Sequence, residues 1–296
     1  MNGTQTLATK KKQSEGSRTV GRVLRLLELL AGDNKAMRLV DIARTLELPV
    51  SSIHVLLGEL LKYNYLTVDE GDNRYKQSSG LVLLANRVLA GTQLTRAAKP
   101  VLESLGAELN ESVYIGMSHA SGIIYVDTVE RTYGLLSRLP LGVPRPSYAS
   151  SSGMVFLAYH VGPEMLASAI ANLKLQPITE HTVVDPTKLK TMIHTVIEQG
   201  YAINDQAVND AVCGVSAPIF FHDRSLAGTV TVSIPEKRFR GREGTFIEPT
   251  VAAAHAVSRN LGAHQPEEIV QYYRNRLATF SQAERHRPRR RRAVAS

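Results

Sequence analysis

Apolar residues near the start of the chain recur every three or four positions, which is the spacing of one face of an α-helix. A first run begins at Thr19, ends at Gly32-Asp33-Asn34 and has its apolar positions at Val20, Val23, Leu24, Leu27 and Leu30. A second, shorter run begins at Leu39, and Pro49 separates it from a third. The pattern therefore predicts three helices between residues 19 and 62.

The third helix is expected to begin at Ser51 or Ser52, because a serine hydroxyl can accept the free N–H groups of a helix start. Its apolar positions fall on one side and leave Val55, Glu59 and Lys62 on the other. Two β-prone runs, YLTV and RYKQ, follow it, and the residues between them suit a tight turn. This order is typical of a winged helix-turn-helix domain, with a generic three-helix domain as the alternative.

Residues 80–110 return to helical spacing, with a break or kink expected at Pro100. The apolar stripe of Leu81, Leu84, Val88 and Leu89 is either core or, on a helix that links two domains, a dimer seam. From Ser112 onward strands alternate with helices, and hairpins are present. This pattern favours an α/β domain on a largely antiparallel sheet.

Charge is concentrated at the two ends of the 296-residue chain, whose formal net charge is +8. Residues 1–18 carry a net charge of +3 and residues 285–296 one of +6, so the remainder is close to neutral at −1. Neither end can bury a core, and we expect both to be disordered. The Arg-rich tail leaves two interpretations open, a solvated tail or a nonspecific grip on DNA.

The length of the chain suits two domains, and no run approaches the ~20 apolar residues that a membrane-spanning helix needs. We therefore expect a cytoplasmic protein with no membrane contact. The single cysteine, Cys213, excludes an intramolecular disulfide and is interpreted as a small buried residue. Because the nine histidines lack metal-ligand spacing, we expect no metal and no other cofactor.

Several stretches make the chain resemble the IclR family of transcriptional regulators over residues 19–260. LVDIARTLELPVSSIHVLLGEL and the hairpin ending in RYKQ are similar to that family's winged helix-turn-helix. PSYASSSGMVFLA is similar to the family's PLHATALGKALLA, and GYAIND and VSAPIFFHDRSLAGTVTVS resemble two later pieces of its ligand-binding domain. The resemblance implies a GAF-like effector domain, homodimers or tetramers, and a repressor or activator of catabolic operons.

The chain departs from the family pattern at a few positions. The family's third helix usually has a basic residue at its start and Arg soon after, where this chain has Val50 and Val55. The family's effector domain usually has an acidic residue where this chain has Ala207, and a cysteine where it has Gly214, with Cys213 one position earlier.

Taken with the resemblance, the pattern predicts an α+β fold in five parts. These are a disordered basic arm at 1–18, a winged helix-turn-helix DNA-binding domain at 19–79, linker or dimerisation helices at 80–110, a GAF-like α/β effector-binding domain at 111–263, and a C-terminal helix with a disordered Arg-rich tail at 264–296.

The winged domain is expected to place its third helix in the major groove of a double-stranded operator. Residues 19–78 hold eight basic and eight acidic residues, so this domain alone should bind phosphates weakly. The basic arm and a second copy of the chain are expected to compensate. The candidate DNA-contacting residues are Arg22, Arg38, Arg44, Ser51, Ser52, His54, Val55, Lys62, Arg74 and Lys76.

Three serines, Ser150, Ser151 and Ser152, precede an apolar helix, where hydroxyls and free N–H groups suit an anion; a plain N-cap is the alternative. By the resemblance, this loop lines the effector pocket. The further candidates are Asn204, Cys213, Gly214, Thr231 and Ser233. Because these residues are neutral, we expect a small organic or aromatic acid held by hydrogen bonds, without Arg or Lys.

The sequence therefore predicts a sequence-specific transcriptional regulator whose operator binding is modulated by a small metabolite. An architectural DNA-binding protein that uses its basic tails is the first alternative, and a hydrolase is the second. Residues 214–218, GVSAP, miss a nucleophile elbow, and no H-E-x-x-H motif occurs. We therefore expect no enzymatic activity and no catalytic residues.

Overall fold

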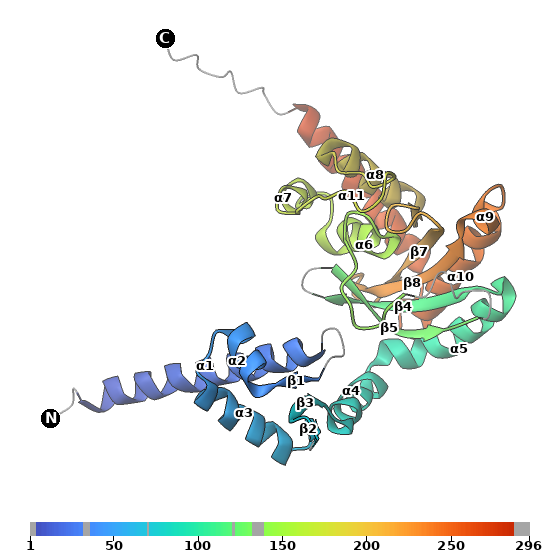
Figure 1. Cartoon of the computed structure of the whole chain (residues 1–296). Helices are drawn as coiled ribbons and strands as arrows, with labels where there is room; N and C mark the ends of the chain where they lie inside the picture. The colour runs from blue at the N-terminus through green and yellow to red at the C-terminus, as the bar shows by residue number, and fades with distance from the viewer. Residues whose placement is uncertain (1–3, 32–35, 70, 120–121, 132–138, 287–296) are drawn as a thin grey trace, which may run out of the picture. The chain divides into compact units, whose positions relative to one another are not determined.

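The computed structural model describes residues 4–31, 36–69, 71–119, 122–131 and 139–286, and its contacts divide the chain into two compact units (Figure 1). The first unit is Met1–Ala90 and the second is Gly91–Ser296. Each is described by itself. The division falls within the expected linker, so α4 (Ser79–Gly91) goes largely with the first unit and α5 (Gln93–Leu109) with the second.

Ahead of α4, the described part of the first unit has three helices and a small antiparallel sheet in the order β1-β3-β2, as a winged helix-turn-helix requires. Its elements are α1 (Thr4–Ala31), β1 (Met37–Arg38), α2 (Leu39–Leu46), α3 (Val50–Lys62), β2 (Leu66–Asp69) and β3 (Arg74–Gln77). The expected hairpin is present as β2 and β3. The two-residue strand β1 was not expected from the sequence, because two residues carry no readable alternation.

The first helix differs from the expectation in its start and in its buried face. It begins at Thr4 rather than Thr19, so residues 4–18, expected to be disordered, are helical. Among the α1 residues whose side chains are described, 18–31, Leu26 and Leu30 are fully buried, whereas Val20 and Leu24 are 61% and 54% exposed. Some apolar residues of α1 therefore lie outside the face that packs against the rest of this unit.

The third helix has the expected core and an unexpected start. Ile53, Leu56, Leu57 and Leu60 are buried against residues of α1, α2 and β2. The serine cap is wrong, because Pro49 occupies the N-cap position, α3 begins at Val50, and no side chain caps it. Pro49 suits the position because its fixed φ, here −58°, favours a helix start and its nitrogen has no N–H to satisfy.

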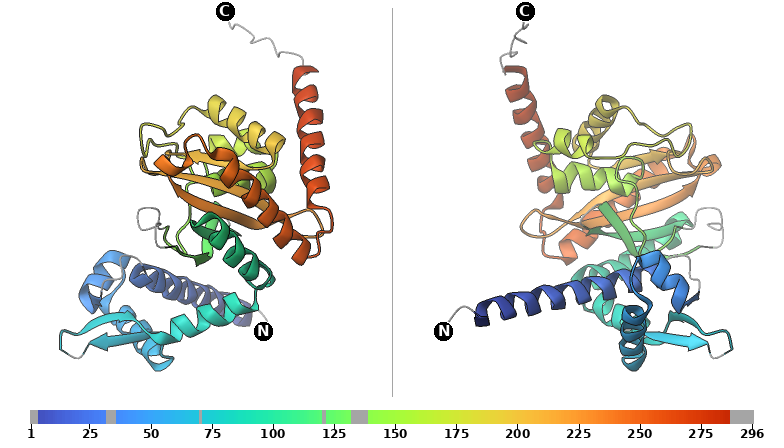
Figure 2. Two further views of the ribbon diagram at one scale, coloured as in Figure 1. Left: turned by 90° about the vertical axis from the view of Figure 1, so that its right-hand side faces the viewer. Right: turned by 60° about the vertical axis from the view of Figure 1, so that its left-hand side comes forward.

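The second unit is built on a five-stranded antiparallel sheet in the order β5-β4-β8-β7-β6 (Figure 2). The strands are β4 (Ser112–His119), β5 (Gly122–Val129), β6 (Ala202–Asp205), β7 (Val212–Phe220) and β8 (Leu226–Pro235). The helical elements are α6 (Ser151–Phe156), the π-helix η2 (Leu157–Val161), α7 (Leu166–Ala171), α8 (Pro186–Gln199), α9 (Glu236–Phe239), α10 (Glu243–Asn260) and α11 (Pro266–His286).

Helices cover both faces of this sheet. One core lies between the sheet and α5 with α10, and the other gathers α6, η2, α8 and α11 on the opposite side. Every residue of β7 and all but the last of β8 are buried. The predicted α+β fold class is confirmed. The break expected at Pro100 is absent, because α5 begins at Gln93 and continues through Pro100.

The C-terminal helix α11 is part of the second core. Tyr273 packs edge-on against Tyr159, with ring centroids 5.1 Å apart, and stacks with Phe220 at 6.0 Å. Arg276 forms a two-pronged ion pair with Glu164, at 2.7 and 3.1 Å. The Arg-rich tail, residues 287–296, lies outside the described residues. No helix in the described part of the chain is both long and apolar enough to cross a membrane.

Gly153, in the first turn of α6, allows this helix to lie against the preceding loop. A Cβ at this position would stand 2.4 Å from Ser147 Cα and 2.6 Å from the Pro146 carbonyl oxygen. We expect Gly153→Ala to lower the free energy of unfolding by about 1–3 kcal/mol, because backbone must move. Urea unfolding measures this, with Gly244→Ala as control because no atom lies within 4 Å of its added Cβ. Equal stability of the two variants would contradict the close approach.

Glu111, at the junction of α5 and β4, has a fully buried carboxyl group. Arg238 Nε lies 3.0 Å from its Oε1, without the alignment of a hydrogen bond. Burial raises the pKa of Glu111 to about 7, and the charge of Arg238 offsets part of that rise. Because its pKa is higher in the folded state than the ordinary 4.5, its contribution to stability is full below about pH 4.5 and is lost as the pH rises through 7.

We therefore expect wild-type protein to lose stability relative to Glu111→Gln as the pH rises from 4.5 to 7, because the variant has no proton to release there. Urea unfolding at pH 5, 6, 7 and 8 measures this difference. Glu108→Gln, at an exposed position on α5, is the control and should give a difference that is flat with pH. A flat difference for Glu111→Gln as well would show that Glu111 keeps an ordinary pKa.

Candidate functional site

The outward face of α3 carries one basic residue, Lys62, in its last turn. Ser51, His54 and Val55 are exposed, Ser52 is half-buried, and the Val55 side chain is 64% exposed. The buried residues on the inner side of α3 fix the rotation of the helix about its axis, and this rotation determines which residues face outward. The structure thus brings together the candidates in the first two turns of α3 as a surface of two hydroxyls, one imidazole and one apolar group, and Lys62 lies in the last turn.

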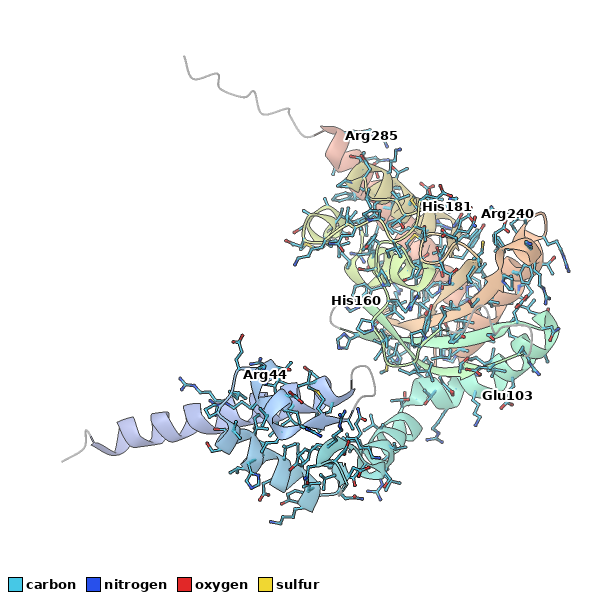
Figure 3. The ribbon with its side chains drawn as sticks, viewed as in Figure 1. Arg44, Glu103, His160, His181, Arg240 and Arg285 are labelled. Atoms are coloured by element: carbon cyan, nitrogen blue, oxygen red, sulfur yellow. The ribbon has the colours of Figure 1, made fainter. Side chains whose placement is uncertain are left out.

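Three of the candidate cations are paired with carboxylates of the same unit. Arg44 lies 3.5 Å from Asp41, Lys62 lies 3.9 Å from Glu59, and Arg74 lies 2.7 Å from Asp72. Arg44 projects from the surface of α2 (Figure 3). These pairs are exposed and weak, but each places a negative charge beside a group expected to meet a phosphate.

The small sheet brings Arg74 together with two further predicted cations, Arg38 and Lys76. Arg38 of β1 stands directly opposite Arg74 of β3, and Lys76 is two residues further along β3, where side chains return to the same face. All three are exposed, whereas Arg22 on α1 is half-buried. The small sheet therefore offers three exposed cations, whereas α3 offers one, Lys62.

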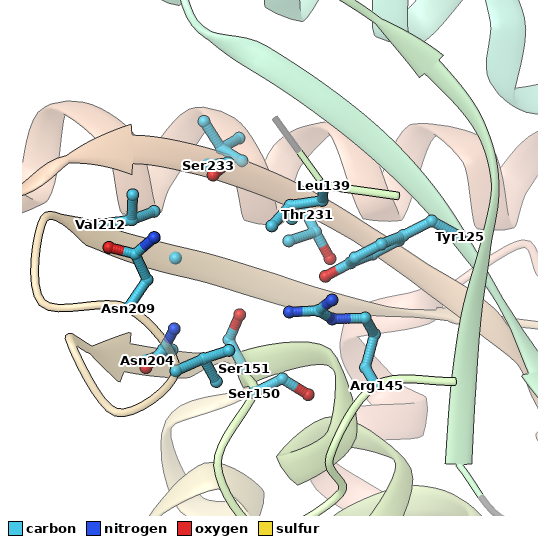
Figure 4. A pocket seen from close by; sticks show the side chains of 13 residues that line it. Tyr125, Leu139, Arg145, Ser150, Ser151, Asn204, Asn209, Val212, Thr231 and Ser233 are labelled. Atoms are coloured by element: carbon cyan, nitrogen blue, oxygen red, sulfur yellow. The ribbon is translucent and has the colours of Figure 1, made fainter. Parts of the chain in front are cut away.

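The second unit contains a pocket between the start of α6 and strands β6, β7 and β8, with a volume of about 50 Å³ (Figure 4). Six of the eight residues expected from the sequence line it: Ser150, Ser151, Asn204, Gly214, Thr231 and Ser233. Residues far apart in sequence thus meet at one end of the sheet. Whether they bind a ligand stays a prediction.

The three serines have three different partners. Ser150 caps α6, accepting the N–H of Gly153 at 3.1 Å and donating to the Pro146 carbonyl at 2.8 Å. Ser151 accepts the hydroxyl of Ser216 at 2.8 Å, and Ser152 is 3.0 Å from the Tyr125 hydroxyl. The plain cap therefore accounts for Ser150, and the other two serines join a buried hydroxyl network.

Two candidates do not line the pocket. Ser152 is fully buried beneath Tyr125, one position past the residues that line it. Cys213 is on the opposite face of β7 from Gly214, because neighbouring residues of a strand point to opposite sides. Burial, reinforced by the charge of Asp205, raises the pKa of the Cys213 thiol to about 12, so it is an inert core residue.

The hydroxyl network continues below the pocket. Ser216, which is completely buried, is 2.7 Å from the Thr231 hydroxyl, and Thr231 is 3.4 Å from that of Thr229. Ser216 itself does not line the pocket, but it contacts two residues that do. It therefore holds Ser151 and Thr231 in fixed orientations.

Sequence reasoning missed Arg145 and Tyr125, both of which point into the pocket (Figure 4). Arg145 lies within the Pro- and Gly-rich stretch LPLGVPRPSYASSSG, which is typical of a connection between elements. Its backbone N–H donates to the Ile123 carbonyl at 2.9 Å, which ties this stretch to β5. The expectation of a pocket without Arg or Lys is therefore wrong. The alternation of β5 could have indicated Tyr125 as inward-facing, but no local signal places Arg145.

The pocket has no grouping suited to a metal. Within the described ranges, no three His, Cys, Asp or Glu side chains lie together as metal ligands. Burial raises the pKa of Tyr125, so its phenol stays protonated and can donate a hydrogen bond. The polar lining is thus made of neutral groups and one guanidinium.

Two family models match the chain. The IclR helix-turn-helix domain matches residues 19–70, and the model described as the bacterial transcriptional regulator IclR C-terminal domain matches residues 86–259. Together they span both units. Helix α11 lies beyond the matched residues.

Curated relatives extend over most of the chain. It is 28% identical over 246 residues to the glycerol operon regulatory protein of Streptomyces coelicolor, covering 82% of this chain and 95% of the relative. It is 27% identical over 249 residues to the transcriptional regulator KipR of Bacillus subtilis, covering 83% and 98%.

Solved structures share the fold. A transcriptional regulator from Rhodococcus sp. RHA1 superposes with a TM-score of 0.74 at 23% identity, covering 83% of this chain and 98% of that one. An IclR homologue from Microbacterium hydrocarbonoxydans, crystallised with 4-hydroxybenzoate, has a TM-score of 0.73 at 23% identity, covering 83% and 99%. With a DNA-reading unit and a ligand-binding unit each matched by its own family model, the chain belongs to the IclR family of transcriptional regulators.

Proposed function

We propose that this protein binds a specific operator in the cytoplasm through α3 and the wing, and that an organic acid in the pocket of the second unit changes this binding. The observation that carries the proposal is the polar pocket at the start of α6, separate from the DNA-reading unit and containing one guanidinium. The homologue crystallised with 4-hydroxybenzoate supports an acid as the ligand class.

The distribution of charge supports a division of labour in DNA binding. The outward face of α3 offers Ser51, His54 and Val55 for base edges, with Val55 suited to a thymine methyl. Phosphate contacts fall to Arg38, Arg74 and Lys76 and to the basic segment at the start of α1, which includes Lys10, Lys11 and Lys12. Arg22, Arg44, Ser52 and Lys62 remain candidates for contacts at the edges of this surface.

Exposed apolar residues in the first unit support association with a second copy. Helix α4 exposes Val82, Leu83, Leu84 and Val88 to between 47% and 59%, and α1 exposes Val20 and Leu24. A monomer gains nothing from such residues on two helices, whereas a homodimer would bury them and double the phosphate contacts. We propose a homodimer or tetramer, as the resemblance implies.

Selection of DNA by the full-length protein tests the function. Duplexes selected from a random library are footprinted with and without a panel of small organic acids. We expect a discrete protected sequence, with one acid shifting the affinity at least ten-fold. Uniform coating of all duplexes would favour an architectural protein, and a footprint that no acid changes would contradict effector control.

Adding charge to α3 tests its position on DNA. We expect Val55→Arg to strengthen binding to random-sequence duplex and to raise the slope of log affinity against log salt by about 0.9, because one more phosphate is neutralised. Val184→Arg adds the same charge at an exposed site of the second unit and is the control. Fluorescence anisotropy across a salt series measures both. An equal gain in the two variants would mean that α3 does not face DNA.

A further inference from the structure

Arg145 is the one residue with a formal charge among the described residues that line the pocket. Its Cζ lies 5.9 Å from the centre of the Tyr125 ring, and its Nε is buried without a hydrogen-bond partner. No carboxylate in the described part of the chain forms an ion pair with it. A buried donor left unsatisfied is destabilising, so the pocket favours a ligand that brings an acceptor to this nitrogen.

Two asparagines are oriented by the backbone so that they offer donors. Asn204 Oδ1 accepts the N–H of Ala207 at 2.8 Å, and Asn209 Oδ1 accepts the N–H of Ala211 at 2.9 Å. With each carbonyl oxygen engaged, the NH2 group is the part left to meet a ligand. Figure 4 shows both amides on the side of the pocket across from Arg145.

The hydroxyl network orients a further donor. Because Ser216 donates to Ser151, the hydrogen of the Ser151 hydroxyl is directed elsewhere, and Ser151 lines the pocket. Gly214 makes room for it, since a Cβ there would stand 3.0 Å from Ser151 Oγ. The guanidinium, two amides and this hydroxyl therefore all present hydrogens, which suits a ligand rich in acceptors and negative in charge.

The volume limits the size of that ligand. At about 50 Å³ the pocket is a third of the roughly 150 Å³ cavity that accommodates benzene. The apolar part of the lining consists of aliphatic side chains, Leu139, Val208, Val212 and Val232. A carboxylate with a short carbon chain meets both the donor set and the volume.

We infer that Arg145 is the specificity-determining residue of the pocket and that it pairs with the carboxylate of a short aliphatic acid. This inference rests on the proposed function, because it assigns the effector of the same site. A charged guanidinium binds a carboxylate through two parallel N–H···O bonds, which an amide or alcohol of equal size cannot reproduce. Arg145 therefore selects acids over their neutral analogues.

Calorimetric titration of the full-length protein tests the inference, with propionate, pyruvate, benzoate and propionamide as probes. We expect wild-type protein to bind a short acid at least ten-fold more tightly than benzoate or propionamide. Arg145→Gln should weaken binding of the short acid by about ten- to hundred-fold without a change for propionamide, and Arg145→Lys should retain part of the affinity. Arg96→Gln removes an exposed arginine of the same unit and should behave as wild type.

Unchanged acid binding in Arg145→Gln, tighter binding of benzoate or propionamide, or no binding of either short acid by wild type would each overturn the inference. Thermal unfolding of the variants without ligand checks that the pocket is intact. The footprints test the proposed function separately. If operator binding responds only to an uncharged ligand, the proposed regulatory function is supported and the inferred role of Arg145 is contradicted. If the footprints are uniform while Arg145 still selects short acids, the proposed function fails and the inference about the pocket stands.

Discussion

The burial of β7 and β8 on both faces constrains the whole second unit. A polar side chain on either strand has no access to bulk water, so it must find its hydrogen-bond partner inside the protein. Ser216, Thr229 and Thr231 meet this requirement by bonding to one another and to Ser151 at the start of α6. The network ends at the pocket, which is where hydrogens remain unmatched.

The same constraint explains which parts of the site could be predicted from the sequence. The resemblance to the family predicted that Asn204, Gly214, Thr231 and Ser233 lie near one another, and the pairing of β6, β7 and β8 brings them together. The alternation of side chains along β7 excludes Cys213, which the sequence comparison alone had kept. Arg145 could not be predicted, since its position depends on a hydrogen bond to β5 that joins residues 22 positions apart in an irregular segment.

In the first unit, hydrophobic periodicity predicted where the helices lie better than it predicted what each helical face contacts. Four of the five residues that the spacing predicts on the inner face of α3 are buried, and the fifth, Leu61, is half-buried, because a buried helical face leaves a strong spacing signal. The exposed apolar residues of α1 and α4 show the limit of that signal, since the sequence does not distinguish a face that packs within the chain from one that awaits another molecule. Hydrophobic periodicity also could not predict the ion pairs on α2, α3 and the wing, because these pairs depend on side-chain rotamers.

Helix α11 lies past the end of the family match, yet its residues fill the same core as those of the matched region. Tyr273 closes an aromatic cluster with Tyr159 and Phe220, and Leu277 is buried beside them. A chain shortened to the family boundary would lose Tyr273 and Leu277 and leave Tyr159 and Phe220 without these packing partners. A domain limit set at residue 259 would therefore divide a single hydrophobic core.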